Sequence, residues 1–213
     1  MGISIAITKG RLEKETVKIL EKGAFGIEGL KDKGRKLVFQ DSKEDIEYFL
    51  VKARDSITYV EHAVADIGIV GLDTLMETDH SCYEVMDLGI GKCKFIVASM
   101  PDKNLFKMRG HIKIGTKYPA VAREFFKSIS MDVEIIKIEG SVELGPILGL
   151  CDGIVDIMET GTTLKENGLI VLREICDISA RVIVNKASFK LKQQQINSFL
   201  SRVYSVISNK NKQ

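Results

Sequence analysis

The sequence predicts an α/β fold in which mostly parallel sheets are covered by helices on both faces. Short, nearly continuous apolar segments recur along the chain, as expected of strands that are buried on both sides. Segments with helical periodicity alternate with them, which is the order of a repeating βα fold. With 213 residues, 45% of them hydrophobic, the chain is long enough to bury a sizeable core.

The expected strands are the apolar, β-branched segments, and the expected helices are the segments with an apolar face. In chain order the strands are ISIAI (3–7), KLVFQ (36–40), YFLVKA (48–53), DIGIVG (66–71), KFIVAS (94–99), IKIGT (112–116), VEIIKI (133–138), GIVDIM (153–158) and ARVIVN (180–185). The helices are expected at 12–23, 58–65, 119–129, 143–150, 160–167 and 196–207. The last is the clearest, because its apolar residues recur every three and four positions.

The glycine-rich segment DLGIGKCKF (87–95) lies in the middle of the chain. It is the expected place for a crossover or hinge between two α/β lobes.

Composition argues against several classes of function. The 31 basic and 29 acidic residues nearly balance, so no global attraction to duplex DNA or an anionic membrane is expected. No apolar segment approaches the length of a membrane span, and the first residues are expected to form a strand rather than a signal peptide. The four cysteines are scattered without a CxxC pair, which favours a reduced, cytoplasmic protein.

The segment DIMETGTTLKENG (156–168) places hydroxyls and a glycine between an expected strand and an expected helix. A helix N-terminus presents amide donors to an anion, and Gly161 lets the backbone approach a ligand closely. Thr160, Thr162 and Thr163 add hydroxyl donors. The alternative is that Thr160 or Thr162 only caps the helix, which needs a single hydroxyl. We therefore favour a phosphate loop.

Acidic residues lie just before this loop. Alternation along the strand places Asp156 and Met158 on one face, with Glu159 at its end, while Asp152 comes before the strand. Carboxylates beside a phosphate loop can hold ribose hydroxyls or a Mg²⁺ ion carried by the substrate. The alternative is that these carboxylates only solvate the end of the strand.

A second segment, IEGSVELGPILGL (138–150), also joins a glycine and a hydroxyl to an apolar helical pattern. Ser141 fits a helix cap there. A second helix N-terminus at the same edge would also suit a second anionic group.

Basic residues follow two of the expected strands. Lys9 and Arg11 come after the first strand, and Lys52 and Arg54 after another. Ligands of open parallel sheets bind at the carboxyl ends of strands, so these charges are better candidates than charges on helix faces. Arg35 lies in a charged segment and is expected at the surface. The three histidines form no cluster, and no role is expected for them.

Taken together, these segments resemble the ATP phosphoribosyltransferase family of histidine biosynthesis. The similar segments span nearly the whole chain: AITKGRL, KARDSITYVEHAVADIGIVGLD, DLGIGKCKFIVA, IGTKYPAVAREFF, GSVELGPILGLCDGIVDIMETGTTLKENGL and ARVIVNKAS. The chain stops after one amphipathic helix, which resembles the short form of the enzyme that lacks the C-terminal regulatory domain.

The resemblance implies a two-lobed, periplasmic-binding-protein-like fold of type II. Lobe I would comprise 1–90 and 179–213, and lobe II, inserted at 91–178, would carry the loop for phosphoribosyl pyrophosphate (PRPP). Adenine N1 of ATP would attack C1′ of PRPP with the help of Mg²⁺, giving phosphoribosyl-ATP and pyrophosphate. A homodimer is expected within a hetero-oligomer that includes a regulatory subunit similar to histidyl-tRNA synthetase.

The resemblance also implies roles for individual residues. The catalytic candidates are Arg54, Lys9 and Arg35. The PRPP-binding candidates are Asp152, Asp156, Glu159, Thr160, Gly161, Thr162, Thr163 and Leu164. The ATP-binding candidates are Arg11, Lys52, Asp73, Ser141, Val142 and Glu143. No metal ligand is assigned on the chain, because Mg²⁺ is expected to arrive with the substrate.

Two other functions remain as alternatives. One is a non-catalytic binder of small molecules with the same two-lobed fold, although such proteins are usually exported. The other is a nucleobase phosphoribosyltransferase, whose PRPP motif normally has two adjacent acids. Here Asp156 and Glu159 are separated by two apolar residues.

Overall fold

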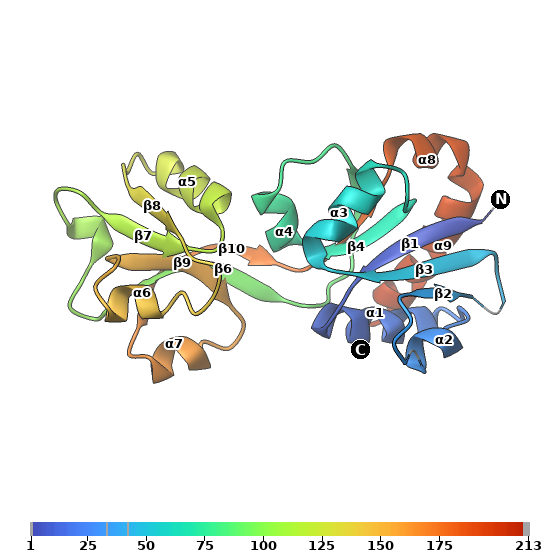
Figure 1. The fold of residues 1–213 in the computed structure, drawn as a ribbon, viewed down its shortest axis with the longest axis horizontal. Coiled ribbons are helices and arrows are strands. Elements are labelled where there is room, and N and C mark those ends of the chain that lie inside the picture. The colour runs from blue at the N-terminus through green and yellow to red at the C-terminus, as the bar shows by residue number, and fades with distance from the viewer. Residues whose placement is uncertain (1, 33, 42, 211–213) are drawn as a thin grey trace. The chain divides into compact units, whose positions relative to one another are not determined.

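The computed structural model describes residues 2–32, 34–41 and 43–210. It consists of two compact units (Figure 1). Unit 1 comprises residues 1–91 and 179–213, and unit 2 comprises residues 92–178. The chain therefore passes between the units at 91/92 and at 178/179, where the expected crossings were 90/91 and 178/179.

Unit 1 is built around a sheet with the strand order β2-β3-β1-β4-β11-β5. Its elements are β1 (Ile3–Thr8), α1 (Arg11–Lys22), α2 (Glu28–Lys31), β2 (Val38–Gln40), β3 (Ile46–Val51), α3 (Ala53–Glu61), β4 (Ile67–Gly71), α4 (Leu72–Glu77), β5 (Tyr83–Asp87), β11 (Ala180–Val184), α8 (Lys186–Leu191) and α9 (Gln193–Lys210). Strands β3, β1 and β4 are parallel, and β2, β11 and β5 pair antiparallel.

Both faces of this sheet are covered, as the nearly continuous apolar strands predicted. On one face, α1, α2 and α9 pack their apolar side chains against alternate residues of β1, such as Ile5 and Ile7. On the other face, α3 and α4 pack against Ala6, Val70 and Ile183. Both kinds of side chain come from the same strands, which is why those strands show no polar alternation.

A buried ion pair joins the amino ends of β1 and β4 to the C-terminal helices. Asp66 accepts hydrogen bonds from the backbone amide of Ser4 (2.9 Å) and from the Lys192 ammonium (2.7 Å). Burial alone would raise the pKa of Asp66, but these donors outweigh burial and hold the pKa below its ordinary value. Removing one partner of such a pair leaves a buried charge uncompensated, so the pair ties α8 and α9 firmly to the sheet.

Unit 2 contains a second sheet, with the order β10-β6-β9-β7-β8. Its elements are β6 (Cys93–Ser99), the 3₁₀ helix η1 (Leu105–Lys107), β7 (Lys113–Thr116), α5 (Pro119–Ser128), β8 (Glu134–Lys137), α6 (Leu144–Ile147), β9 (Gly153–Met158), α7 (Thr162–Glu166) and β10 (Ile170–Ile178). Strands β8, β7 and β9 are parallel, while β6 and β10 are antiparallel to their neighbours. Figure 1 shows α5 and α7 on opposite sides of this sheet.

The structure differs from the sequence prediction in several elements. Helix α3 begins at Ala53, not at 58, and α6 is shorter than the expected helix at 143–150. Strands β5 and β10 and helix α4 were not predicted. Each sheet is mixed, because antiparallel strands adjoin three parallel strands, on both sides in unit 1 and on one side in unit 2. Within the described part of the chain, no helix has the length and apolar character needed to span a membrane.

Candidate active site

The carboxyl ends of the three parallel strands of unit 1 lie at one edge of its sheet. In the register of the sheet, Thr8 is the partner of Val51, and Ile7 is the partner of Ile69. Two further bonds tie the strand ends together. The Lys9 amide donates to the Val51 carbonyl (2.9 Å), and the Thr8 hydroxyl donates to the Ile69 carbonyl (2.8 Å). Helices α1, α3 and α4 each start within three residues of these strand ends.

The predicted residues of unit 1 gather at this edge. Lys9 directly follows β1, and Arg11 is the first residue of α1. Lys52 is the N-cap of α3, so Arg54 lies in the first turn of that helix. Asp73 lies in the first turn of α4. The four basic side chains are exposed, which suits contact with an anionic ligand.

The segment that carries Arg35 leads toward the same edge from strand β2. Strand β2 runs antiparallel to β3, with Val38 paired to Phe49, and the Leu50 amide donates to the Leu37 carbonyl (2.9 Å). The chain before β2 therefore leads toward the end of β3, and Arg35 lies there in a turn. The sequence prediction put Arg35 at the surface, and its side chain is indeed exposed. The antiparallel pairing directs the segment that carries Arg35 toward the basic edge.

Unit 2 repeats this arrangement with a different set of residues. Strands β7, β8 and β9 are parallel, and each is followed by a loop at the same edge of the sheet. The loop after β8 carries Ser141, Val142 and Glu143. The loop after β9 carries residues 159–161 and leads into α7.

The loop from Glu159 to Leu164 has the backbone that its glycine predicts. Gly161 is left-handed (φ +78°) and stands at the N-cap of α7. A Cβ atom at this position would lie 3.2 Å from Met158 Sδ. Any other residue would thus be strained by the backbone conformation and would crowd Met158 as well.

The threonines of this loop offer only a weak helix cap. The N-cap position of α7 is Gly161, which has no side chain to cap the helix. The Thr160 and Thr162 hydroxyls lie 3.1 Å apart, and the Thr162 amide is 3.5 Å from Thr160 Oγ1, too far for a strong bond. Leu164 is buried in the core between α7 and the sheet, so its side chain anchors the loop. Thr160 therefore caps this helix weakly at most, and the binding of phosphate by the loop stays a prediction.

The loop after β8 also differs from a simple helix cap. The N-cap position of α6 is Glu143, and Ser141 instead adopts a left-handed conformation (φ +49°). The Ser141 carbonyl accepts from the Leu144 amide (3.0 Å), which closes a tight turn. Val142 as a whole is only 3% exposed and belongs to the core. Ser141, in contrast, is exposed.

Asp156 lies near the end of β9, on the face that α6 and α7 cover. Burial raises the pKa of its carboxyl group, and the nearby negative charge of Glu143 raises it further. The Ile157 amide, which donates to Asp156 Oδ1 (2.8 Å), and the Lys117 ammonium act in the opposite direction. A half-buried carboxylate whose pKa is raised costs the folded protein stability while it is ionised.

Replacing Asp156 with asparagine is therefore expected to raise the midpoint of thermal unfolding near pH 7 while lowering turnover about 10-fold. The folded-state pKa is above the unfolded value, so the stabilising effect is full above the folded pKa. It disappears as the pH falls below the unfolded pKa, where wild-type Asp156 is also neutral. Thermal melts over a pH series measure the stability, and initial rates measure the turnover. A variant that loses both stability and activity near pH 7 would contradict this account.

Asp152 does not lie beside the loop, and the prediction that placed it there is wrong. Asp152 precedes β9, whereas the loop follows β9, so the full strand of six residues separates them. Its carboxylate accepts from the Lys113 amide (3.0 Å) and pairs with Lys103 (3.1 Å). Asp152 is thus a structural residue at the amino end of the strand.

Lys117 and Tyr118 were missed by the sequence prediction. They form the loop after β7 and complete the same edge as the loops after β8 and β9. The charge of Lys117 acts on the Asp156 carboxyl group, which places it near the predicted PRPP-binding residues. The signal was present, because lysine directly follows the expected strand IKIGT, as Lys9 and Lys52 follow other strands.

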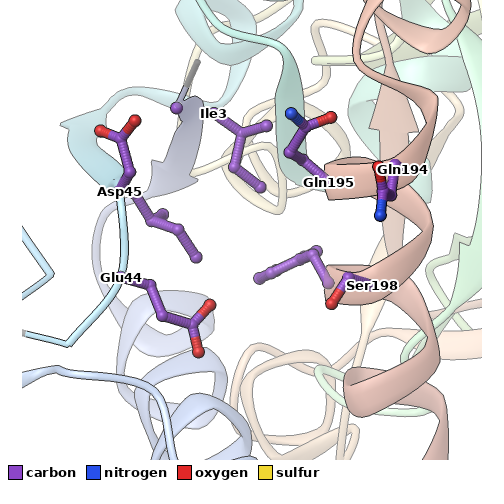
Figure 2. A pocket seen from close by; sticks show the side chains of 9 residues that line it. Ile3, Glu44, Asp45, Gln194, Gln195 and Ser198 are labelled. Carbon is purple, nitrogen blue, oxygen red and sulfur yellow. The ribbon is translucent and has the colours of Figure 1, made fainter.

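A well-defined hollow of unit 1 lies at the opposite edge of its sheet. The cavity of about 420 Å³ lies where β1 and β3 begin, and Figure 2 shows Glu44, Asp45, Gln194, Gln195 and Ser198 around it. No lysine or arginine is among the described residues that line it. A phosphate-bearing substrate is better matched by the basic edge than by this acidic hollow.

Comparisons with known proteins agree with this arrangement. The family model HisG, ATP phosphoribosyltransferase, matches residues 52–205. An ATP phosphoribosyltransferase of Clostridium kluyveri is 57% identical over 201 residues, covering 94% of this chain and 92% of the relative. The ATP phosphoribosyl transferase (HisG:HisZ) complex from Thermotoga maritima has a similar structure. It matches with a TM-score of 0.81 and 36% identity, over 97% of this chain and 99% of the other.

The fold is also found outside this family. The periplasmic aliphatic sulphonate binding protein SsuA from Escherichia coli matches 97% of this chain and 68% of its own, with a TM-score of 0.60. At 10% identity this likeness shows the fold alone. The predicted two-lobed, periplasmic-binding-protein-like fold is thereby confirmed.

Proposed function

Because the chain belongs to the ATP phosphoribosyltransferase family, it is a pentosyltransferase, and we propose a role for each candidate residue in its reaction. This reaction is the first step of histidine biosynthesis. Adenine N1 of ATP attacks C1′ of PRPP, the bond from C1′ to the pyrophosphate oxygen breaks, and phosphoribosyl-ATP forms. The observation that carries the proposal is the Gly161 loop at the carboxyl edge of unit 2, whose threonines offer more hydroxyls than the one long bond to the helix uses.

The 159–164 loop would hold the 5′-phosphate of PRPP. A left-handed glycine and the hydroxyls of Thr160, Thr162 and Thr163 are the features that a phosphate needs. Asp156, two residues before the end of the strand, would accept hydrogen bonds from the ribose hydroxyls. Glu159 would lie at the mouth of the same loop. Asp152 is left out, because its carboxylate is engaged at the far end of β9.

The basic edge of unit 1 would stabilise the departing pyrophosphate. As the bond to C1′ breaks, negative charge grows on the pyrophosphate while the ribose gains oxocarbenium character. Cations that bind this growing charge more tightly than the ground state lower the barrier. Arg54 is the first candidate because its guanidinium is a natural fork for phosphate oxygens, and Lys9 and Arg35 are the others.

The remaining candidates would bind ATP. Arg11 and Lys52 carry positive charge beside Lys9 and Arg54, which suits a triphosphate. Asp73, Ser141 and Glu143 would offer acceptors or donors to the nucleoside, whereas the buried Val142 would support the turn that carries its neighbours. Adenine N1 is unprotonated at neutral pH, so its attack requires no strong general base.

The reaction of this family is metal-dependent, and we propose Mg²⁺ as the ion. In the described part of the chain, no group of three or more His, Cys, Asp or Glu side chains is placed to hold a metal. These residues do not fit a resident ion. Mg²⁺ commonly binds substrate phosphates while keeping several waters, so it would arrive with PRPP or ATP.

We also propose a regulatory partner and a cytoplasmic location. The Thermotoga maritima protein was solved as a HisG:HisZ complex, and its chain is matched over 99% of its length. A homodimer of this chain would accordingly assemble with a subunit similar to histidyl-tRNA synthetase. All four cysteines are free, as suits the reducing compartment in which ATP and PRPP are made.

A near-ultraviolet assay of the purified chain tests the proposal. The chain is mixed with ATP, PRPP and Mg²⁺, and pyrophosphatase is added to pull the reaction forward. Growth of phosphoribosyl-ATP absorbance is expected, either with the chain alone or after a HisZ subunit is added. If the absorbance does not change in either case, while calorimetry still shows PRPP binding, the result would favour the non-catalytic binding protein instead.

A further inference from the structure

Two segments connect unit 1 to unit 2. Within unit 1, each segment is hydrogen-bonded to the carboxylate of Asp87. The first connection is residues 88–91, and the second returns at Ser179. Asp87, the last residue of β5, accepts a hydrogen bond from the Gly89 amide (2.8 Å) at Oδ1. The same oxygen accepts a second bond from the Ser179 hydroxyl (2.7 Å). One side-chain oxygen thus holds both connections.

The second oxygen of Asp87 is held from the neighbouring strand. Arg181 is the register partner of Asp87 on β11, and its Nη1 atom lies 2.5 Å from Asp87 Oδ2. Burial alone would raise the pKa of Asp87, but the Gly89, Ser179 and Arg181 donors hold the pKa below its ordinary value. Asp87 therefore remains an ionised acceptor under ordinary conditions.

The backbones of the two connections also pair with each other. The Leu88 amide donates to the Ala180 carbonyl, and the Ala180 amide donates to the Ile90 carbonyl, both at 2.9 Å. Leu88 and Ile90 are buried in the core of unit 1. Gly89 between them is left-handed (φ +62°), which a β-branched residue would not tolerate. The first connection is thus anchored in unit 1 as far as Ile90.

The first connection is also bonded to the helix that starts at the basic edge. The Gly91 amide donates to Glu15 Oε2 on α1 (3.2 Å). Glu15 Oε1 lies 3.9 Å from Arg11 Nε in the first turn of the same helix. The last residue before the crossing is therefore bonded to an α1 side chain that also contacts a candidate ATP-binding residue.

We propose that Asp87 is a positioning residue for phosphoribosyl transfer, which holds the Gly89 and Ser179 connections in one register. The inference rests on the proposed function, because Gly91 in the first connection is bonded to Glu15, which contacts the candidate ATP-binding residue Arg11. Asp87 lies outside the candidate substrate-binding residues. It acts through the connections and not by touching a substrate.

Hydrogen exchange tests the structural half of the proposal without any activity assay. In Asp87→Ala, the amides of Leu88, Gly89 and Ala180 are expected to exchange about 10-fold faster than in the wild type. Ser179→Ala is a milder variant that removes one bond, and it is expected to speed exchange at Ala180. The matched control is Glu84→Gln, because Glu84 also contacts Arg181 (3.3 Å) but bonds neither connection. Equal exchange in Asp87→Ala and Glu84→Gln would overturn the proposal.

Kinetics test the functional half. Asp87→Ala is expected to lower kcat about 10-fold or more while the Kd for PRPP alone changes less than about twofold, because the 159–164 loop is untouched. Asp87→Asn keeps an oxygen acceptor at Oδ1 and is expected to retain most of the kcat. A kcat equally low in Asp87→Asn and Asp87→Ala would overturn the proposal, because the Arg181 ion pair would then be the cause. If the wild type is inactive but the exchange rates change as expected, the proposed function is wrong. The role of Asp87 in holding the two connections is then still supported.

Discussion

Replacing Arg54 with alanine is expected to lower kcat about 100-fold while changing the Kd for PRPP little. Arg54 lies in the first turn of α3, at the carboxyl edge of the unit 1 sheet, and its side chain is exposed. We assign it to the charge that develops on pyrophosphate only as the bond to C1′ breaks. An interaction that strengthens in the transition state is lost from kcat and not from ground-state binding.

Steady-state rates and calorimetric titration with PRPP measure the two quantities. Arg109→Ala is the control, because Arg109 is an exposed arginine that precedes β7, at the opposite end of the unit 2 sheet from the phosphate loop. Its kcat is expected to stay near the wild-type value. If Arg54→Ala weakens PRPP binding but leaves kcat unchanged, Arg54 binds the substrate and does not assist the departure of pyrophosphate.

Replacing Gly161 with valine is expected to abolish detectable PRPP binding while the protein stays folded. Gly161 has a φ of +78°, and a Cβ atom there would lie 3.2 Å from Met158 Sδ. A β-branched residue disfavours this conformation by about 1–2 kcal/mol, so the loop is expected to leave it. The threonine hydroxyls would then lose the arrangement that we assign to the 5′-phosphate.

Gly168→Val is the matched control for backbone strain. Gly168 follows the other end of α7 and is also left-handed (φ +73°), but a Cβ atom added there would have no described atom within 4 Å. Both variants carry the same kind of strain, so similar losses of thermal stability are expected. Only Gly161→Val should lose PRPP binding in calorimetry. An unchanged affinity of Gly161→Val for PRPP would contradict the proposal that this loop binds the 5′-phosphate.

Much of the fold could be predicted because apolar strands are contiguous in sequence. The segment GIVDIM was predicted with the bounds that β9 has. By contrast, β10 was missed because irregularities between Val171 and Arg173, and between Glu174 and Cys176, break the alternation along an edge strand. The helix expected at 143–150 is only α6, because Gly149 is left-handed and ends the helical conformation.

Site residues that directly follow a strand could be predicted from the sequence. Residues whose position depends on which strands pair could not. Residues after parallel strands meet at one edge, so Lys9, Lys52 and Thr160 could be selected from sequence. Asp152 was placed wrongly because it is close to the loop in sequence, whereas the predicted strand between them carries the two to opposite ends. The position of Arg35 depends on the antiparallel pairing of β2 with β3, which no local pattern encodes.

The placement of β11 in the unit 1 sheet has a consequence for synthesis on the ribosome. β11 pairs with both β4 and β5, but it is translated only after the whole of unit 2. Until then, β4 presents an unpaired edge, and β5 lacks its sheet partner. Unit 2 is continuous in sequence and can fold first, whereas unit 1 must wait for its last strand and for α9. Nascent chains that stall before residue 180 are therefore expected to be the aggregation-prone species of this protein.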